Sequence, residues 1–221
     1  MKSKSAAAPF GVWMILFTIV PLAMVAWFAF TDDQGAFTLD NLRQIGDYTD
    51  TFLHSIALGA LSTAICLLLG YPLAYSIARR TQRVQQTMIM LIMLPMWMNF
   101  LLRTYAWMSI LENRGFINQF LGLFGLHANL INTDGAVVLG MVYDFLPFMV
   151  LPLYSVMTKL DHRVLEAAQD LGANQFQVFR RVVLPLSKPG IVSGITMVFV
   201  PAVSTFVISK LLGGGKNMAG G

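Results

Sequence analysis

The feature that most constrains this chain is a set of five long apolar runs. In chain order they are residues 10–30, 55–78, 88–111, 136–157 and 189–208. A bilayer core about 30 Å thick needs about 20 helical residues, because only a helix satisfies its own backbone polar groups within lipid. Each run is long enough, and only 12% of all residues are charged. We therefore expect an all-α integral membrane protein, one domain over residues 1–221 with a bundle of five transmembrane helices, and no nucleic-acid partner.

Basic residues mark one side of this expected bundle. If the connecting segments alternate between sides, ten of the fifteen Lys and Arg residues fall in the N-terminus and in segments 79–87 and 158–188. They are Lys2, Lys4, Arg79, Arg80, Arg83, Lys159, Arg163, Arg180, Arg181 and Lys188. Because positive charge accumulates on the inner side, the N-terminus is predicted to be cytoplasmic. The run 10–30 is too long for the apolar part of a signal peptide and is expected to be an uncleaved first span.

Prolines interrupt the apolar runs at six positions. Each proline lacks a backbone donor and is expected to kink or interrupt its helix. The six are Pro21, Pro72, Pro95, Pro147, Pro152 and Pro201. Proline is frequent in membrane helices in general, but six kinked or broken positions together favour a protein that moves, such as a transporter.

The longest cytoplasmic segment, residues 158–188, has the pattern of two short helices. Asp161 is placed to cap the first helix, and Gly172 is placed where a left-handed residue would end it. A second helix is expected over Asn174–Val183, closed by Pro185 and Pro189 before the fifth span. Such a paired structure immediately before a span indicates a folded element rather than a plain polar connector.

This segment resembles the EAA motif of the membrane subunits of binding-protein-dependent ABC importers. The matching residues are Glu166, Ala167, Ala168, Gly172, Leu184 and Pro185, with Val182 where isoleucine is commoner. The resemblance implies the fold of a type I ABC importer permease in the bacterial inner membrane. It also implies that the first helix couples to a pair of cytoplasmic ATPase subunits, which use ATP and Mg²⁺, while this chain carries no cofactor. A second, similar permease and an extracytoplasmic binding protein are the other expected partners. The alternative is an amphipathic segment on the membrane surface.

The resemblance extends over most of the chain. Leu94–Trp107, Gly140–Asp161 and Leu211–Asn217 are similar to permease subunits that serve spermidine and putrescine. That similarity implies a polyamine cargo, with iron or amino acids as alternatives. Members of the family continue with a further helix, and five spans from a cytoplasmic N-terminus would leave the C-terminus outside. We therefore expect this sequence to be a fragment that lacks the last helix.

Two charged residues within the spans are candidates for the translocation path. An aspartate such as Asp144 costs about 2.5–3.5 kcal/mol at the centre of a bilayer, so it should face the bundle or water. With Tyr143 beside it, it offers the charge and ring chemistry that attracts an amine cation. Its alternatives are an ion pair with Arg103 or a hydrated position near the interface. Arg103 is followed by Tyr105 and Trp107 and is interpreted either as part of this path or as a snorkelling residue among interfacial aromatic side chains.

A short amphipathic helix is expected on the outer side, between the third and fourth runs. Ile117, Phe120, Leu121 and Phe124 recur at helical spacing. Such a helix either contacts the binding protein or rests in the membrane interface.

The sequence offers no enzymatic motif. Gly213–Lys216 resembles part of a phosphate loop, but Asn217 stands where serine or threonine is required. Only one cysteine, Cys66, is present, so the chain can form no intrachain disulfide and no cysteine-based metal site. The chain is therefore interpreted as a transport subunit rather than an enzyme. One remaining alternative is a channel or a transporter driven by an ion gradient, which would favour several ionisable groups within the spans. Another is a membrane scaffold that transports nothing.

Overall fold

The computed structural model describes residues 8–32, 35–39, 41, 46, 49–205 and 207–213. The chain forms two compact units, Met1–Asp50 and Thr51–Gly221. Predictions that involve Lys2, Lys4 and residues 214–217 lie outside the described residues.

The first unit is built around the first apolar run. Its helical segments are α1 (Ala8–Met14), the π-helical turn η2 (Ile15–Ile19) and α2 (Val20–Ala29). Together they supply one long apolar helix over Pro9–Ala29, long enough to cross a membrane. After it, Thr31 and Phe37 form an isolated antiparallel bridge, and the Asn41 side chain donates to the Phe28 and Thr31 carbonyl oxygens, both at 3.0 Å.

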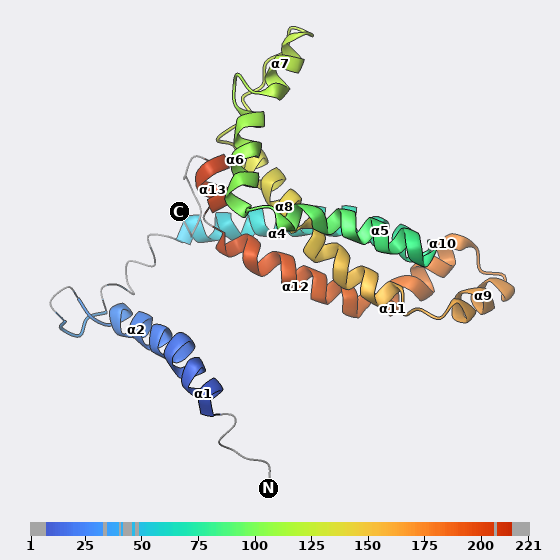
Figure 1. Cartoon of the computed structure of the whole chain (residues 1–221), viewed down its shortest axis with the longest axis horizontal. Helices are drawn as coiled ribbons and strands as arrows, with labels where there is room; N and C mark the ends of the chain where they lie inside the picture. Colours follow the sequence, from blue (N-terminus) through green and yellow to red (C-terminus); the bar gives the residue numbers. More distant parts are fainter. Residues whose placement is uncertain are drawn as a thin grey trace. The chain divides into compact units, whose positions relative to one another are not determined.

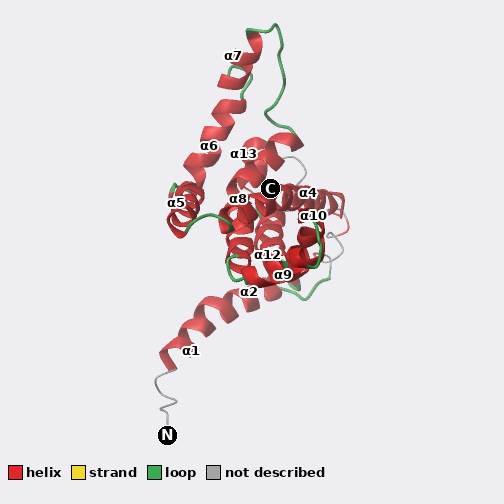
Figure 2. Ribbon diagram, turned by 90° about the vertical axis from the view of Figure 1, so that its right-hand side faces the viewer, coloured by secondary structure: helices red, strands yellow, loops and turns green. Residues whose placement is uncertain are grey.

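The second unit is a helical bundle (Figures 1 and 2). Its elements are α4 (Thr49–Ala78), α5 (Gln82–Met93), the 3-10 turn η4 (Leu94–Trp97), α6 (Phe100–Leu111), α7 (Phe116–Gly122), α8 (Asp134–Met157), α9 (His162–Asp170), α10 (Gln175–Val178), the π-helical turn η5 (Phe179–Val183), α11 (Leu184–Leu186), α12 (Lys188–Ser204) and α13 (Val207–Leu212). Among the described residues the regular structure is helical apart from the single bridge in the first unit. The all-α prediction is therefore confirmed.

The core of the bundle is centred on α8. Met149 and Leu153 of α8 are fully buried. On α12, Gly190 and Gly194 let the two backbones approach closely: a Cβ at Gly190 would lie 3.1 Å from the Pro152 carbonyl oxygen, and one at Gly194 would lie 2.7 Å from Met149 Sδ. Small residues at such a crossing allow close packing where the hydrophobic effect between helices is absent.

The third predicted span, residues 88–111, is not one continuous helix. Pro95 cannot donate to the carbonyl four residues before it, and α5 gives way to the 3-10 turn at that point. The chain then becomes extended at Met98, and Asn99 starts α6 by accepting the Leu101 amide at 2.9 Å. The helices before and after this break differ in direction by 88°. We call residues 94–99 the helix break.

The other prolines have milder effects. Four of them lie inside continuous helices, namely Pro72, Pro147, Pro152 and Pro201. The last apolar run is also divided, because α12 ends at Ser204 and α13 begins at Val207. Within the described part, three helices are long and apolar enough to cross a membrane, or up to five if each of two bent pairs counts as one span.

Candidate functional site

The first candidate region is the segment that carries the EAA-like residues, and α9 is its first helix. Asp161 caps α9 by accepting the Arg163 amide at 2.9 Å. At the other end, Gly172 has a φ of +85°, the Gly172 amide donates to the Gln169 carbonyl, and the Ala173 amide donates to the Ala168 carbonyl. These two hydrogen bonds around a left-handed glycine form a Schellman motif. The predicted cap and the predicted glycine stop are both confirmed.

The second helix of this segment begins as predicted and ends later. Asn174 and Gln177 form a capping box, with hydrogen bonds of 2.9 and 3.0 Å in the two directions. The predicted end at Val183 is wrong, since the helical path continues through η5 and α11 to Leu186, between Pro185 and Pro189. The Leu184 amide donates to the Phe179 carbonyl, five residues back, and this wider turn carries the chain past a proline that has no amide to donate.

The motif residues lie on the surface of the bundle. α9 and α10 occupy one end of it, while α6 and α13 lie toward the other (Figure 1). Glu166, Ala167 and Pro185 are exposed, and Ala168 is half-buried. Leu184 is partly exposed.

Large apolar side chains surround this motif and are left uncovered within the chain. Leu171 is 88% exposed and Phe176 is 68% exposed, and Val164 on α9 is also exposed. Single exposed apolar residues are common, but a group of them beside a helix capped at both ends is a candidate binding surface. We call α9 to α11 with these side chains the loop surface.

Aromatic residues join the loop surface to α4. The Tyr71 hydroxyl lies 2.8 Å from Ser187 Oγ, which itself donates to the Leu184 carbonyl at 3.0 Å. The rings of Tyr71 and Tyr75 both meet the ring of Phe179 edge-on, with centroids 5.7 Å apart. The sequence analysis missed this contact. The two tyrosines four residues apart on one face of an apolar helix were the available signal.

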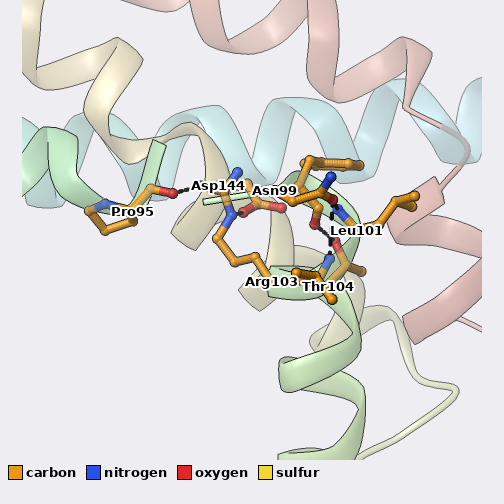
Figure 3. A network of polar contacts seen from close by, with 8 residues as sticks. Pro95, Asn99, Leu101, Arg103, Thr104 and Asp144 are labelled. Carbon is orange, nitrogen blue, oxygen red and sulfur yellow. Dashed lines mark hydrogen bonds and ion pairs between the residues drawn. The ribbon is translucent and has the colours of Figure 1, made fainter. Parts of the chain in front are cut away.

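The second candidate region is the buried pair of charged residues. Arg103 of α6 and Asp144 of α8 form an ion pair through Nε and Oδ1, and both side chains are buried (Figure 3). Arg103 Nη1 also donates to the Pro95 carbonyl at 2.6 Å. Of the alternatives for Asp144, the structure has the pair with Arg103 rather than a hydrated interfacial position. Arg103 turns toward the helix break instead of snorkelling.

Aromatic rings complete this region. The Arg103 guanidinium carbon lies 5.9 Å from the ring centroids of both Phe100 and Tyr143. The Trp107 ring packs edge-on against Tyr143 at 5.3 Å. Four of the five predicted path residues therefore gather at one place. Tyr105 does not join them: it is 47% exposed and takes no part in these ring contacts. We call Asp144, the Pro95 carbonyl and the rings of Phe100 and Tyr143 the cation cage.

The short helix predicted between the third and fourth apolar runs is present as α7, which ends at Gly122, before Phe124. Asn118 lies on its buried side, donates to the carbonyls of Glu112 and Ala128 at 3.2 and 2.9 Å, and accepts the Ala128 amide at 3.0 Å. Phe120 and Phe124 of the predicted apolar face are exposed. Asn118 thus holds the outer loop together while this apolar face remains available for lipid or a partner.

Comparison with known proteins gives a consistent result. Residues 3–219 match the family described as "Binding-protein-dependent transport system inner membrane component". The spermidine/putrescine transport system permease protein PotB of Escherichia coli (strain K12) is 40% identical over 217 residues, covering 93% of this chain and 79% of that protein. The protein of the same name in Haemophilus influenzae is 39% identical over 215 residues, covering 92% of this chain and 75% of that protein.

Solved structures agree on the fold. A bacterial ABC transporter involved in the import of the acidic polysaccharide alginate superposes with a TM-score of 0.67, at 18% identity, over 94% of this chain and 72% of that one. Its complex with an alginate pentasaccharide-bound periplasmic protein gives a TM-score of 0.66, also at 18% identity, over 93% of this chain and 72% of that one. At this level of identity the likeness establishes the fold alone.

Proposed function

Because the chain belongs to the family of binding-protein-dependent transport system inner membrane components, as a permease subunit and not an enzyme, we propose that it imports polyamines with energy from ATP. The assignment of polyamines as the cargo rests on the 40% identity, over nearly the whole chain, to permeases named for spermidine and putrescine. The cation cage supports the same cargo, since a carboxylate beside aromatic rings attracts an amine cation.

The loop surface is the proposed contact with the ATPase. α9 is capped at both ends and so can move as one rigid piece, and its Glu166 is free to pair with a basic residue. The exposed Leu171 and Phe176 supply apolar area that a groove in a partner would cover. ATP and Mg²⁺ would act in that partner, whose closure would push α9 and, through Phe179 and Tyr71, move α4.

We propose the remaining partners and the orientation by analogy with the family. An extracytoplasmic binding protein would deliver the cargo, and a second, similar permease would complete the path. With the loop surface on the ATPase side, the proposed orientation has the N-terminus in the cytoplasm of a bacterium. Arg79, Arg80 and Arg83 then lie on that same side, as the positive-inside rule requires.

The test is stimulation of ATP hydrolysis in the assembled importer. The complete gene product is purified with the permease, ATPase and binding protein encoded beside it, and the binding protein is loaded in turn with spermidine, putrescine, ferric iron or amino acids. We expect stimulation by spermidine or putrescine alone. Stimulation by iron or an amino acid instead would show that the cargo is that compound and not a polyamine. Failure of any ATPase to co-purify would overturn the ATP-driven mechanism and favour a gradient-driven transporter.

A further inference from the structure

The cation cage is already occupied, and its occupant is a side chain of the protein itself. The Asp144 carboxylate and the Pro95 carbonyl face the Arg103 guanidinium (Figure 3). The ring centroids of Phe100 and Tyr143 lie 5.9 Å from the guanidinium carbon. Oxygen acceptors and ring faces all attract positive charge. The same groups would attract an amine cation for the same reasons. The geometry is therefore that of a cation-binding site in which the Arg103 guanidinium takes the place of the cation.

The pair is poised for exchange rather than for maximum stability. Desolvating two charges offsets much of their attraction, so a buried ion pair contributes little net stability, while removing one partner alone is strongly unfavourable. A cargo ammonium that replaces the guanidinium keeps Asp144 paired throughout. One cation then leaves the carboxylate as another arrives, so the buried Asp144 carboxylate is never left without a partner.

Arginine is suited to this exchange because it holds two acceptors through different nitrogens. Nε contacts Asp144, whereas Nη1 donates to the Pro95 carbonyl at 2.6 Å. The bond to the helix break can persist while Nε gives up the carboxylate. Tyr143 and Trp107 are only half-buried, so the aromatic side of the cage reaches the surface of this chain, where a cargo can approach.

We propose that Arg103 is an internal competitor for the cargo site on Asp144, holding the cage closed until an ammonium group of the cargo displaces it. The inference rests on the proposed polyamine transport. It explains why an arginine lies in a path for cations: the guanidinium sets how tightly the permease holds its cargo, keeping affinity low enough for release. Arg103 therefore tunes affinity, and Asp144 with Tyr143 binds the cargo.

The test is equilibrium binding of radiolabelled spermidine to the assembled importer without its binding protein. If the cage is free of Arg103 about 10% of the time, Arg103→Gln should tighten binding about tenfold, because apparent affinity scales with the competent fraction. Asp144→Asn should weaken binding, and the double variant should resemble Asp144→Asn. Arg103→Lys, which keeps the charge but loses the planar fork, should tighten binding less than Arg103→Gln and serves if the latter does not assemble.

Matched aromatic variants locate the cage. Tyr143→Leu should weaken spermidine binding, whereas Tyr105→Leu should not, since Tyr105 lies outside the cage and is exposed. Opposite effects of Arg103→Gln and Asp144→Asn on spermidine binding would indicate competition. If the ion pair were purely structural, replacing either residue would weaken the binding. Weakened or unchanged binding in both arginine variants overturns the proposal.

A wild-type control distinguishes failure of the proposed role of Arg103 from failure of the proposed polyamine transport. Spermidine-loaded binding protein should stimulate ATP hydrolysis by the wild-type importer. If it does and the opposite shifts are missing, only the competitor role of Arg103 fails. If it does not, the polyamine function fails and this proposal fails with it.

Discussion

The loop surface and the cation cage use polar residues in opposite ways. In the loop surface, Glu166 is exposed beside uncovered Leu171 and Phe176. In the cage, Arg103 and Asp144 are buried and paired with each other. The open apolar area of the loop surface suits the proposed contact with an ATPase, whereas each charge of the buried pair has its partner inside the chain. Substitutions in the first region should therefore leave folding intact and impair function, whereas in the second region the loss of Asp144 alone should impair folding.

The largest expected effect on stability comes from breaking the pair on one side. Asp144→Ala leaves the buried Arg103 guanidinium without its carboxylate, which costs about 3–5 kcal/mol. We expect a clear loss of assembled complex and a lower thermal midpoint in detergent. The double variant Arg103→Gln with Asp144→Asn removes both charges and should be much closer to wild type. Equal midpoints for Asp144→Ala and wild type would mean that the pair does not hold α6 to α8.

The next effect extends the comparison to the packed core. Gly194→Ala places a Cβ 2.7 Å from Met149 Sδ and 3.3 Å from the Met149 carbonyl oxygen, and such overpacking costs about 1–3 kcal/mol. Gly11→Ala is the control, since nothing lies within 4 Å of its Cβ. Thermal midpoints should fall for Gly194→Ala and hold for Gly11→Ala. A fall of the same size in both would mean that the α8–α12 contact is not the cause, because alanine favours a helix more than glycine does at either position.

A smaller effect separates folding from function in the loop surface. Gly172→Ala puts a side chain on a backbone with a φ of +85°, at a cost of about 1–2 kcal/mol. Gly125→Ala, at a φ of +70° in the outer loop, imposes similar strain elsewhere. Both variants should lose similar stability, and only Gly172→Ala should reduce stimulated ATP hydrolysis. Equal loss of hydrolysis in both would show that strain alone, and not the position of α9, controls the rate.

The smallest effect on stability concerns the contact between loop and bundle. Tyr71→Phe removes a hydroxyl that pairs with Ser187, a loss of about 0.5–1.5 kcal/mol, while keeping the ring against Phe179. Tyr75→Phe is matched to it, because that ring also packs on Phe179. We expect less cargo moved per ATP in Tyr71→Phe than in Tyr75→Phe. Identical ratios of cargo moved to ATP hydrolysed in the two variants would show that the Tyr71 hydroxyl does not couple the loop surface to α4.

Local signals in the sequence predicted the helices and the shape of the loop surface. The Asp161 cap and the Gly172 stop depend on residues a few positions away, so pattern alone found them. The 88° helix break was only partly visible, since Pro95 indicated an interruption but no pattern fixed its angle. Contacts between distant segments could not be predicted from the sequence alone. The Arg103–Asp144 pair was one alternative among several. No sequence pattern indicated the contact between Tyr71 and Ser187, which lie 116 residues apart.

Uptake of labelled spermidine by proteoliposomes that contain the assembled importer tests the central claim most directly. The wild type should accumulate spermidine only when ATP and the binding protein are supplied. Glu166→Lys should assemble with a normal thermal midpoint yet lose this uptake, because like charges facing each other across an interface cost several kcal/mol. Uptake that follows an imposed ion gradient without ATP, or that persists unchanged in Glu166→Lys, would contradict the account.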